Sequence, residues 1–378
     1  MDFIPFNKTY IPGETNDLIA EVLKSGWITT GLKVKEFEKE FLKAIESDNE
    51  AIAVSSGTAA LHLAYIGAGI KSGDEVIVPS FTFCSTINML VHLGAKPIFC
   101  DISEAMLCID PEDIKKKITS KTKAIVVVHY AGYSCEMNEI NKIAKEHNLT
   151  VIEDAAHAFL TKYNGDYIGS GKNITCFSFY ATKNLTTAEG GMVVCADKEK
   201  SERIRMLSMH GISKDGWNRY SEIGKWRYDV MEPGYKYNMT DIHACIGLSQ
   251  LKYHNKSHLR RVEIAMKYKE MLSRNPYIIL PKDPTDKNSE HAWHLFAIRV
   301  SDNSPVNRDD LIVKLKEFNI GTSVHFIPNH QQSFYKDSSI ILPITEQVGN
   351  TILSLPMYEL LTDKEIIYIS DTINQILK

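Results

Sequence analysis

Short apolar segments alternate with helical segments between Ala51 and Glu153. Each apolar segment has the length of a strand, and the segments between them repeat apolar residues at helical spacing. Parallel neighbouring strands need crossover connections, which are usually helices, so the alternation predicts an α/β fold with a mostly parallel sheet covered by helices. The expected strands are residues 51–54, 75–78, 97–100, 124–129 and 150–153; the expected helices run from the turn at 55–60 to about 66, and over 85–93, 111–118 and 137–147.

The second half of the chain divides into two parts. Strands at 174–179 and 192–195 and a helix at 198–209 lead to a polar and aromatic insertion, Gly211 to Pro233. A long helical stretch then begins near Asn238 or Thr240, either of which is a plausible N-cap, and continues to Met271. Further on, strands are expected at 277–280, 294–300 and 320–326, with helices at 308–318 and 363–377. We therefore predict a large domain with an N-terminal arm over residues 1–250, and a linking helix with a small C-terminal α+β domain over residues 251–378.

Composition narrows the class of protein. The 378 residues are 44% hydrophobic and 24% charged with a net charge of -4, which is ordinary for an enzyme and argues against nucleic acid or membrane as the main partner. The N-terminus lacks the basic start and apolar run of a signal peptide, and no window reaches the apolar length of a membrane span. Seven scattered cysteines without a C-x-x-C pair indicate reduced core thiols, so we expect a cytoplasmic protein.

One lysine, Lys183, lies between the apolar segments 174–179 and 192–195. The stretch around it contains small and hydroxyl residues and turns at Gly190 and Gly191. The ordinary interpretation is an exposed loop lysine. The functional interpretation is a desolvated amine, because burial lowers the basicity of lysine and makes it a nucleophile.

Two further motifs follow predicted strands. Ser55 to Ala60 joins a strand to a helix, and the free amides and positive end of a helix N-terminus attract anions, although small residues are common at such turns. Asp154 ends the strand 150–153 and precedes two alanines and His157, where open parallel sheets place their ligands, although an aspartate there can also cap a helix. Together the motifs supply an anion site, a carboxylate and an amine, which are the groups that pyridoxal 5'-phosphate needs.

The sequence resembles the DegT/StrS family of sugar-nucleotide aminotransferases over nearly its whole length. The resemblance rests on motifs that occur in the family's order, namely residues 54–63, 79–83, 153–157, 178–183, 188–191 and 234–241. Within the family, residues 26–31 and 178–192 look closest to UDP-4-amino-4-deoxy-L-arabinose aminotransferase. The resemblance implies the fold type I of pyridoxal-phosphate enzymes, with a large, mostly parallel seven-stranded sheet and a smaller C-terminal domain.

The resemblance also implies roles for individual residues. Lys183 would bind the cofactor covalently and carry a proton, Asp154 would keep the pyridine nitrogen protonated, and His157 would contact the ring or its 3-hydroxyl. Phe83 would stack on the ring, where the closest relatives use Trp. The phosphate would be held by Gly57, Thr58 and Ser178, with Asn238 reaching the cofactor of the neighbouring subunit in a homodimer with shared active sites. The insertion 211–233 would cover the partner's site.

For the nucleotide sugar we expect contacts from the N-terminal arm, the lysine loop and the C-terminal domain. The expected residues are Trp27, Thr29, Tyr180, His325 and His330. Without the family resemblance, Trp27 is equally explained by packing, and two histidines near a strand end are more often structural.

The predicted reaction is transfer of an amino group from L-glutamate to C4 of a 4-keto sugar linked to UDP or dTDP, a 6-deoxyhexose or a pentose, for surface polysaccharide, lipopolysaccharide or other glycan synthesis. A 3-aminotransferase is the near alternative. A dehydratase of this fold would carry histidine in place of Lys183, and a regulatory protein without catalysis would need neither Lys183 nor Asp154.

Overall fold

The computed structural model describes residues 1–213 and 228–378. Its main element is a seven-stranded sheet in the order β1-β9-β8-β5-β4-β2-β3. The strands are β1 (Glu50–Val54), β2 (Glu75–Pro79), β3 (Lys96–Cys100), β4 (Thr122–Val128), β5 (Thr150–Asp154), β8 (Ile174–Ser178) and β9 (Gly191–Cys195). Neighbours from β3 to β8 are parallel, and β9 is antiparallel to both β8 and β1. The predicted mostly parallel sheet is confirmed.

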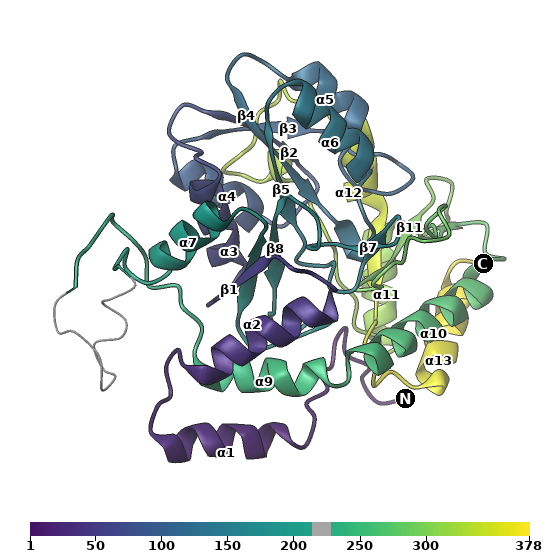
Figure 1. Cartoon of the computed structure of the whole chain (residues 1–378). Coiled ribbons are helices and arrows are strands. Elements are labelled where there is room, and N and C mark those ends of the chain that lie inside the picture. Colours follow the sequence, from purple (N-terminus) through teal and green to yellow (C-terminus); the bar gives the residue numbers. More distant parts are fainter. Residues whose placement is uncertain (214–227) are drawn as a thin grey trace.

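Helices cover both faces of this sheet (Figure 1). On one face lie α3 (Gly57–Gly67), α4 (Ser85–His92) and α7 (Lys198–Leu207), whose apolar side chains share a core with alternate strand residues such as Val54, Val126 and Cys176. The other face is covered by α2 (Leu32–Ala44) and α9 (Asp241–Leu251) at one end and by α5 (Pro111–Lys117) and α6 (Met137–Glu146) at the other. Successive side chains along each strand point to opposite faces of the sheet, so they pack in two separate layers of core.

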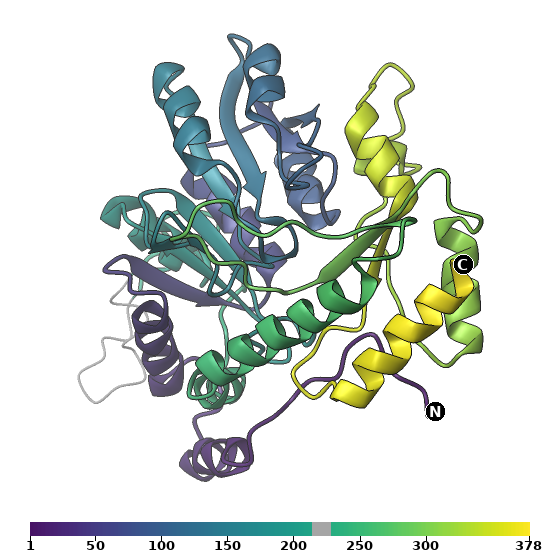
Figure 2. The same ribbon diagram turned by 90° about the vertical axis from the view of Figure 1, so that its right-hand side faces the viewer.

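A second core lies beside the sheet (Figure 2). It is built from α10 (His254–Leu272), α11 (Arg308–Glu317), α13 (Asp363–Ile376) and a three-stranded antiparallel sheet of β10 (Ile278–Ile279), β11 (Phe296–Val300) and β12 (Ile352–Leu355). Ile4 from the N-terminus also belongs to it. Remaining short elements are α1 (Thr15–Ser25), α12 (Pro343–Thr351), the hairpin β6 (Lys162–Tyr163) and β7 (Asp166–Tyr167), and the 3-10 turns Tyr130–Gly132 and Asn329–Gln331. The domain boundary after residue 250 stays a prediction.

Some predicted elements are wrong. The helix expected to run to Met271 breaks at Lys252 and Tyr253, because α9 packs in the core of the large sheet and α10 packs in the second core. Thr240, and not Asn238, caps α9 by accepting the backbone N–H of His243. The segment 320–326 is not a strand: it makes only isolated bridges, Ile320 to Ile4 and Ser323 to Ser354.

Other elements were not predicted, the main ones being α1, α12 and β12. The short strand β12 is fully buried between other elements, so it lacks the polar alternation that marks a strand with one exposed face. No helix within 1–213 or 228–378 is long and apolar enough to cross a membrane.

Candidate active site

The strand ends bring the predicted residues to one edge of the sheet. Asp154 is the last residue of β5 and Ser178 the last of β8, and these two strands run parallel. β1 is antiparallel to β9, which is antiparallel to β8, so β1 also ends at this edge and leads directly into α3. Carboxyl ends of parallel strands are the usual place for a ligand in this architecture.

Asp154 is buried and fully hydrogen bonded. Its Oδ2 accepts the hydroxyl of Thr86 at 2.7 Å, and its Oδ1 accepts the backbone N–H of Ala156 at 3.1 Å. Because Thr86 donates to the carboxylate, its oxygen is left to accept the hydroxyl of Thr82 at 2.9 Å. No helix follows Asp154, which removes the alternative that this aspartate is a helix cap.

The pKa of Asp154 is raised by burial, while the hydrogen bonds from Thr86 and Ala156 and the charge of Lys183 act against that increase. Burial favours the neutral acid, whereas hydrogen bonds to the carboxylate and a nearby cation favour the charged form. A further positive charge, such as a protonated pyridine nitrogen, would complete the stabilisation of the carboxylate.

Lys183 lies in the loop between β8 and β9. The residue is half-buried. Surrounding protein nevertheless lowers the pKa of its amine to about 8, with Asp154 acting in the opposite direction. At pH 7 roughly one tenth of an amine with this pKa is unprotonated, which is the nucleophilic form.

The imidazole of His157 is held from behind. Its Nδ1 accepts the backbone N–H of Ala131 at 3.2 Å, so in the neutral ring Nε2 carries the proton. Burial, followed by the charges of Lys183 and His325, lowers the pKa of His157 well below its usual value. The ring is therefore a neutral hydrogen-bond donor, as the 3-hydroxyl oxygen of a ligand requires.

The turn from β1 into α3 is the place where an anion site is predicted. Ser56 caps α3 by accepting the N–H of Ala59 at 3.0 Å, and helix geometry leaves the N–H groups of Gly57 and Thr58 without intrahelical partners. A Cβ on Gly57 would lie 2.8 Å from Cβ of Ser178 and 3.1 Å from its Oγ. Gly57 thus lets Ser178 approach the helix end, a packing reason that the sequence did not show.

The predicted aromatic residue Phe83 precedes α4 and is 59% exposed. Its ring centroid lies 6.2 Å from that of Phe326, which also stacks on His157 at 5.9 Å. An exposed ring between two site segments is available to a planar ligand. Stacking on a cofactor stays a prediction.

The two predicted C-terminal histidines lie in different surroundings. His325 is close enough to Lys183 for the two charges to interact, its Nδ1 contacts Oγ of Ser354 at 3.0 Å, and burial lowers its pKa to about 4. His330 is buried, with Nδ1 2.7 Å from Oγ of Ser80 and Nε2 3.3 Å from Glu346. Both ring nitrogens of His330 are therefore occupied, so the structure favours a packing role for it, and substrate binding stays a prediction.

The N-terminal residues form a loop against the start of α9. Asp241 accepts the N–H groups of Gly31 and Val34, and its own N–H donates to the carbonyl of Thr29 at 3.0 Å. Trp27 donates from Nε1 to the carbonyl of Thr30 and is 46% exposed. Tyr180 is likewise 48% exposed, and contact of either ring with a substrate stays a prediction.

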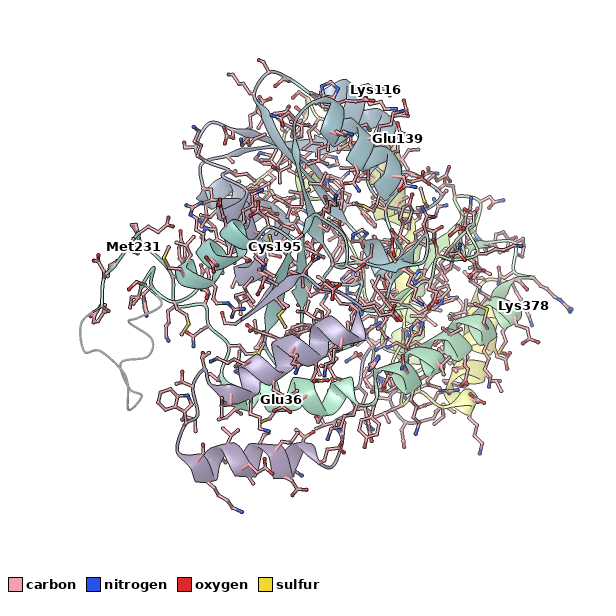
Figure 3. All side chains as sticks on the ribbon, in the orientation of Figure 1. Glu36, Lys116, Glu139, Cys195, Met231 and Lys378 are labelled. Carbon is pink, nitrogen blue, oxygen red and sulfur yellow. The ribbon has the colours of Figure 1, made fainter. Side chains whose placement is uncertain are left out.

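Asn238 donates to Oγ1 of Thr30 at 2.6 Å within its own chain. The insertion 211–233 falls mainly on residues 214–227, which lie outside the described residues. Of its described part, Val230 and Met231 are exposed apolar side chains, and Met231 lies at the opposite side of the view from Lys378 (Figure 3).

Sequence reasoning missed several residues of this site. They are Thr86, which holds Asp154; Ala131, which holds His157; and Asn184 and His294, which contact one another. Each acts through a neighbour on another segment, so no local motif marks it. Within the described residues, no group of three or more His, Cys, Asp or Glu side chains could hold a metal ion.

The arrangement fits pyridoxal phosphate. A buried carboxylate with a raised pKa, an amine with a lowered pKa and two free helix amides lie at one sheet edge, and each matches a different group of that cofactor.

Comparison with known proteins gives a consistent result. The model of the DegT/DnrJ/EryC1/StrS aminotransferase family matches residues 10–374. The spore coat polysaccharide biosynthesis protein SpsC of Bacillus subtilis is 44% identical, covering 100% of this chain and 97% of its own length.

Solved structures agree with the sequence comparison. The PMP form of the sugar aminotransferase Spr1654 from Streptococcus pneumoniae superposes with a TM-score of 0.92 and 31% identity, over 99% of this chain and 98% of that one. PseC of Helicobacter pylori, an aminotransferase involved in the biosynthesis of pseudoaminic acid, has a TM-score of 0.91 and 28% identity, over 100% of this chain and 99% of its own.

Proposed function

Because the chain belongs to the DegT/DnrJ/EryC1/StrS aminotransferase family, we propose that it transfers an amino group from L-glutamate to C4 of a nucleotide-linked 4-keto sugar. The protein is a pyridoxal-phosphate-dependent sugar aminotransferase, as the sequence predicted. The nucleotide, the sugar and the position of amination are the proposal. The specific UDP-arabinose subtype stays a prediction.

The observation that carries the proposal is the proximity of Lys183 and Asp154, whose charges are close enough to affect each other's pKa. The pKa of the Lys183 amine is about 8, and Asp154 is a buried carboxylate at the edge of the sheet where the parallel strands end. When bound, pyridoxal phosphate supplies an electron sink that allows a proton to leave the carbon bearing the amino group. Lys183 would accept that proton and return it to the carbon on the cofactor, which requires an amine that is neutral part of the time.

The other residues have distinct proposed tasks. Asp154 holds a negative charge opposite the ring nitrogen, and Thr86 orients that charge. His157 donates from Nε2, since Ala131 occupies Nδ1. Gly57, Thr58 and Ser178 bind the phosphate through two backbone amides and a hydroxyl. Trp27, Thr29, Tyr180 and His325 contact the nucleotide sugar, and His330 supports the segment that carries His325.

A sugar nucleotide as acceptor is supported by the relatives. SpsC acts in spore coat polysaccharide biosynthesis, and PseC in that of pseudoaminic acid. The presence of Lys183 favours transamination over a dehydratase, which in this fold carries histidine at that position. Amination at C3 remains the near alternative, because no described residue distinguishes the two carbons.

Two assays test the proposal in sequence. The purified holoenzyme is mixed with L-glutamate alone, and the visible absorbance of lysine-bound cofactor is expected to disappear; no change with glutamate, glutamine or alanine would refute the donor. The enzyme is then given glutamate and UDP-, dTDP- or GDP-linked 3-keto and 4-keto sugars. Product mass and NMR assign the aminated carbon, and amination at C3 alone would replace the C4 proposal. Lys183→Ala is the matched control and should show neither change.

We further propose a homodimer with shared active sites, in which Asn238 reaches the partner's cofactor phosphate. Trp27, Val230 and Met231 are exposed apolar side chains, which supports a contact with a second subunit. Co-expression of Lys183→Ala with Asn238→Ala should restore part of the activity, because one of the two sites in a mixed dimer then receives both intact residues. No restoration in mixed dimers isolated through two different tags would refute sharing.

A further inference from the structure

Asn184, the residue after Lys183, connects the lysine loop to the segment 291–295, which directly precedes β11. Its Nδ2 donates to the carbonyl of Ala292 at 2.8 Å, and its Oδ1 lies 3.0 Å from Nδ1 of His294. The amide orientation is fixed by the first bond, because a carbonyl oxygen can only accept. Oδ1 therefore faces His294, and Nδ1 of His294 must be the donor.

Among the described residues, no hydrogen-bond partner is found for the second nitrogen of His294. Among residues 1–213 and 228–378, Nδ1 of His258 is the one side-chain N or O atom that is fully buried and has no hydrogen bond. Since Nε2 of His294 also has no hydrogen bond there, it must keep some accessible surface. The neutral ring has its proton on Nδ1, the opposite tautomer from that of His157, whose ring centroid lies 4.3 Å away.

Both histidines are anchored to a single residue. Ala131 donates its N–H to Nδ1 of His157, and its carbonyl accepts the N–H groups of His294 and Leu295 at 2.9 and 3.2 Å. Ala131 adopts a left-handed conformation with φ 57°. This conformation turns its N–H and carbonyl toward different segments, so one residue sets the positions of both rings.

The segment that carries His294 is also held on its other side. The buried guanidinium of Arg261 donates to the carbonyls of Trp293, His294 and Met357 at 3.2, 3.5 and 3.0 Å. Ala292 donates to the carbonyl of Gly132 at 3.0 Å. A rigid support of this kind can define the position of a neighbouring loop.

We propose that Asn184 and His294 form a positioning pair, which holds the loop at Lys183 against the rigid segment 291–295 and so fixes the lysine amine relative to Asp154 and His157. The base of that loop is secured elsewhere, by Thr186 and Thr187 bonding to the carbonyl of Phe179. The middle of the loop, where Lys183 lies, is secured to the C-terminal half of the chain through Asn184. The inference rests on the role proposed for Lys183.

Two substitutions of His294 separate positioning from direct contact. His294→Asn puts an amide N–H near the place of Nδ1 and keeps the bond to Asn184. His294→Gln puts its amide near Nε2 and loses that bond. If the pair positions the lysine, His294→Gln lowers kcat on the order of 100-fold with little change in KM, and His294→Asn loses much less.

Asn184→Ala provides the complementary test, with Asn275→Ala as its matched control. Asn275 is also half-buried and makes two side-chain hydrogen bonds, to Asn374 and from the N–H of Tyr277, both at 3.0 Å. Both variants lose two hydrogen bonds and should lose similar thermal stability. Only Asn184→Ala should lower kcat, and it should do so as much as His294→Gln.

A spectroscopic readout is independent of turnover. In the holoenzyme, a pH titration of visible absorbance follows the protonation of the lysine-bound cofactor. Loosening the loop admits water to a site where desolvation disfavours the charged form, so in Asn184→Ala the titration midpoint should rise by roughly one pH unit. Asn275→Ala should titrate as the wild type does.

The outcomes are distinct. A larger loss in His294→Asn than in His294→Gln would mean that Nε2 acts directly on the ligand and would overturn the positioning role, and equal losses would overturn it too, because the bond to Asn184 would then make no difference to kcat. Unchanged kcat and midpoint in Asn184→Ala would reduce the pair to ordinary packing. A wild-type holoenzyme without lysine-bound cofactor absorbance would instead refute the role of Lys183 itself.

Discussion

Two sides of the site face Lys183, and they differ in charge and in hydrogen bonding. On the carboxylate side, both oxygens of Asp154 are occupied, one by Thr86 and one by Ala156, and every one of these bonds favours the charged form. On the histidine side, which comprises His157, His294 and His325, each ring has Nδ1 bonded to protein, and burial lowers its pKa. The carboxylate side thus stabilises a buried negative charge. The histidine side stays neutral, with the Nε2 atoms of its rings left to contact a ligand.

This difference matters for catalysis by a lysine. A cation near Lys183 would lower the pKa of its amine further and compete with it for Asp154. Neutral histidines can surround the amine without that repulsion, and they can be packed at a ring distance of 4.3 Å, as His157 and His294 are. Asp154 therefore supplies the negative charge of the site, and the neutral histidines position the groups around Lys183.

Asp154→Asn gives the largest expected effect, because it removes the charge and keeps the shape. We expect kcat to fall on the order of 100- to 1000-fold, as when a preorganised electrostatic group is lost from an active site. His157→Gln keeps a neutral donor and should lose on the order of 10-fold. Steady-state kinetics on both variants measures the comparison directly, and equal losses would contradict the division between the two sides.

The origin of these two sides shows how far the sequence could lead. Lys183, Asp154, His157 and the helix turn at Gly57 each follow a strand, and strand ends can be recognised from apolar periodicity. The sheet and these residues could therefore be predicted together. The sequence did not show one further constraint on Gly57, whose missing Cβ accommodates Ser178.

What could not be predicted acts across segments distant in sequence. Ala131 links His157 to His294, and Arg261 supports the carbonyl of His294, without any spacing rule that joins them. The break at Lys252 was also hidden, since helical periodicity continues on both sides and only the existence of two cores requires it. The residues predicted for the sugar depend on a bound substrate and remain predictions.

Gly132→Ala should disrupt the histidine side more than any single hydrogen bond. Gly132 has φ +97°, and an added Cβ would meet Ala292 Cβ at 3.0 Å and the backbone of His157 and Trp293 at 3.1 Å. Gly165 has φ +99° but only Asn288 Cβ at 3.8 Å. Urea denaturation should show a loss of about 2–4 kcal/mol for Gly132→Ala, where strain and crowding add, and about 1 kcal/mol for Gly165→Ala. Similar losses of stability in the two variants would mean that the backbone at 131–132 accommodates the added Cβ without moving the rings of His157 and His294.

Lys183→Met tests whether the buried amine of Lys183 lowers the free energy of unfolding. In the folded protein the pKa of Lys183 is about 8, compared with 10.5 for an unperturbed lysine. Below pH 8 both states are protonated and the folded state carries a desolvated charge, so this substitution should stabilise the cofactor-free protein by roughly 1–2 kcal/mol at pH 7, allowing for the partial exposure of the side chain. The advantage should shrink as pH rises from 8 to 10.5, where the unfolded state binds more protons. A gap that does not depend on pH would assign the gain to apolar packing alone.

The smallest expected effect concerns the neutrality of His325. Its pKa is about 4 in the folded protein, compared with a reference value of 6.5 for the unfolded chain. Between pH 4 and 6.5, His325 is therefore protonated in the unfolded state and mostly neutral in the folded state. Stability should therefore fall as pH decreases from 6.5 toward 4, and His157 and His294 act in the same direction. His325→Asn retains an amide near Ser354 and removes the titration, so it should recover about 1 kcal/mol at pH 4.5 relative to pH 7. If His325→Asn follows the wild-type slope, His325 is already charged in the folded site, and a protonated imidazole would then stand beside Lys183 where the histidine side requires a neutral one.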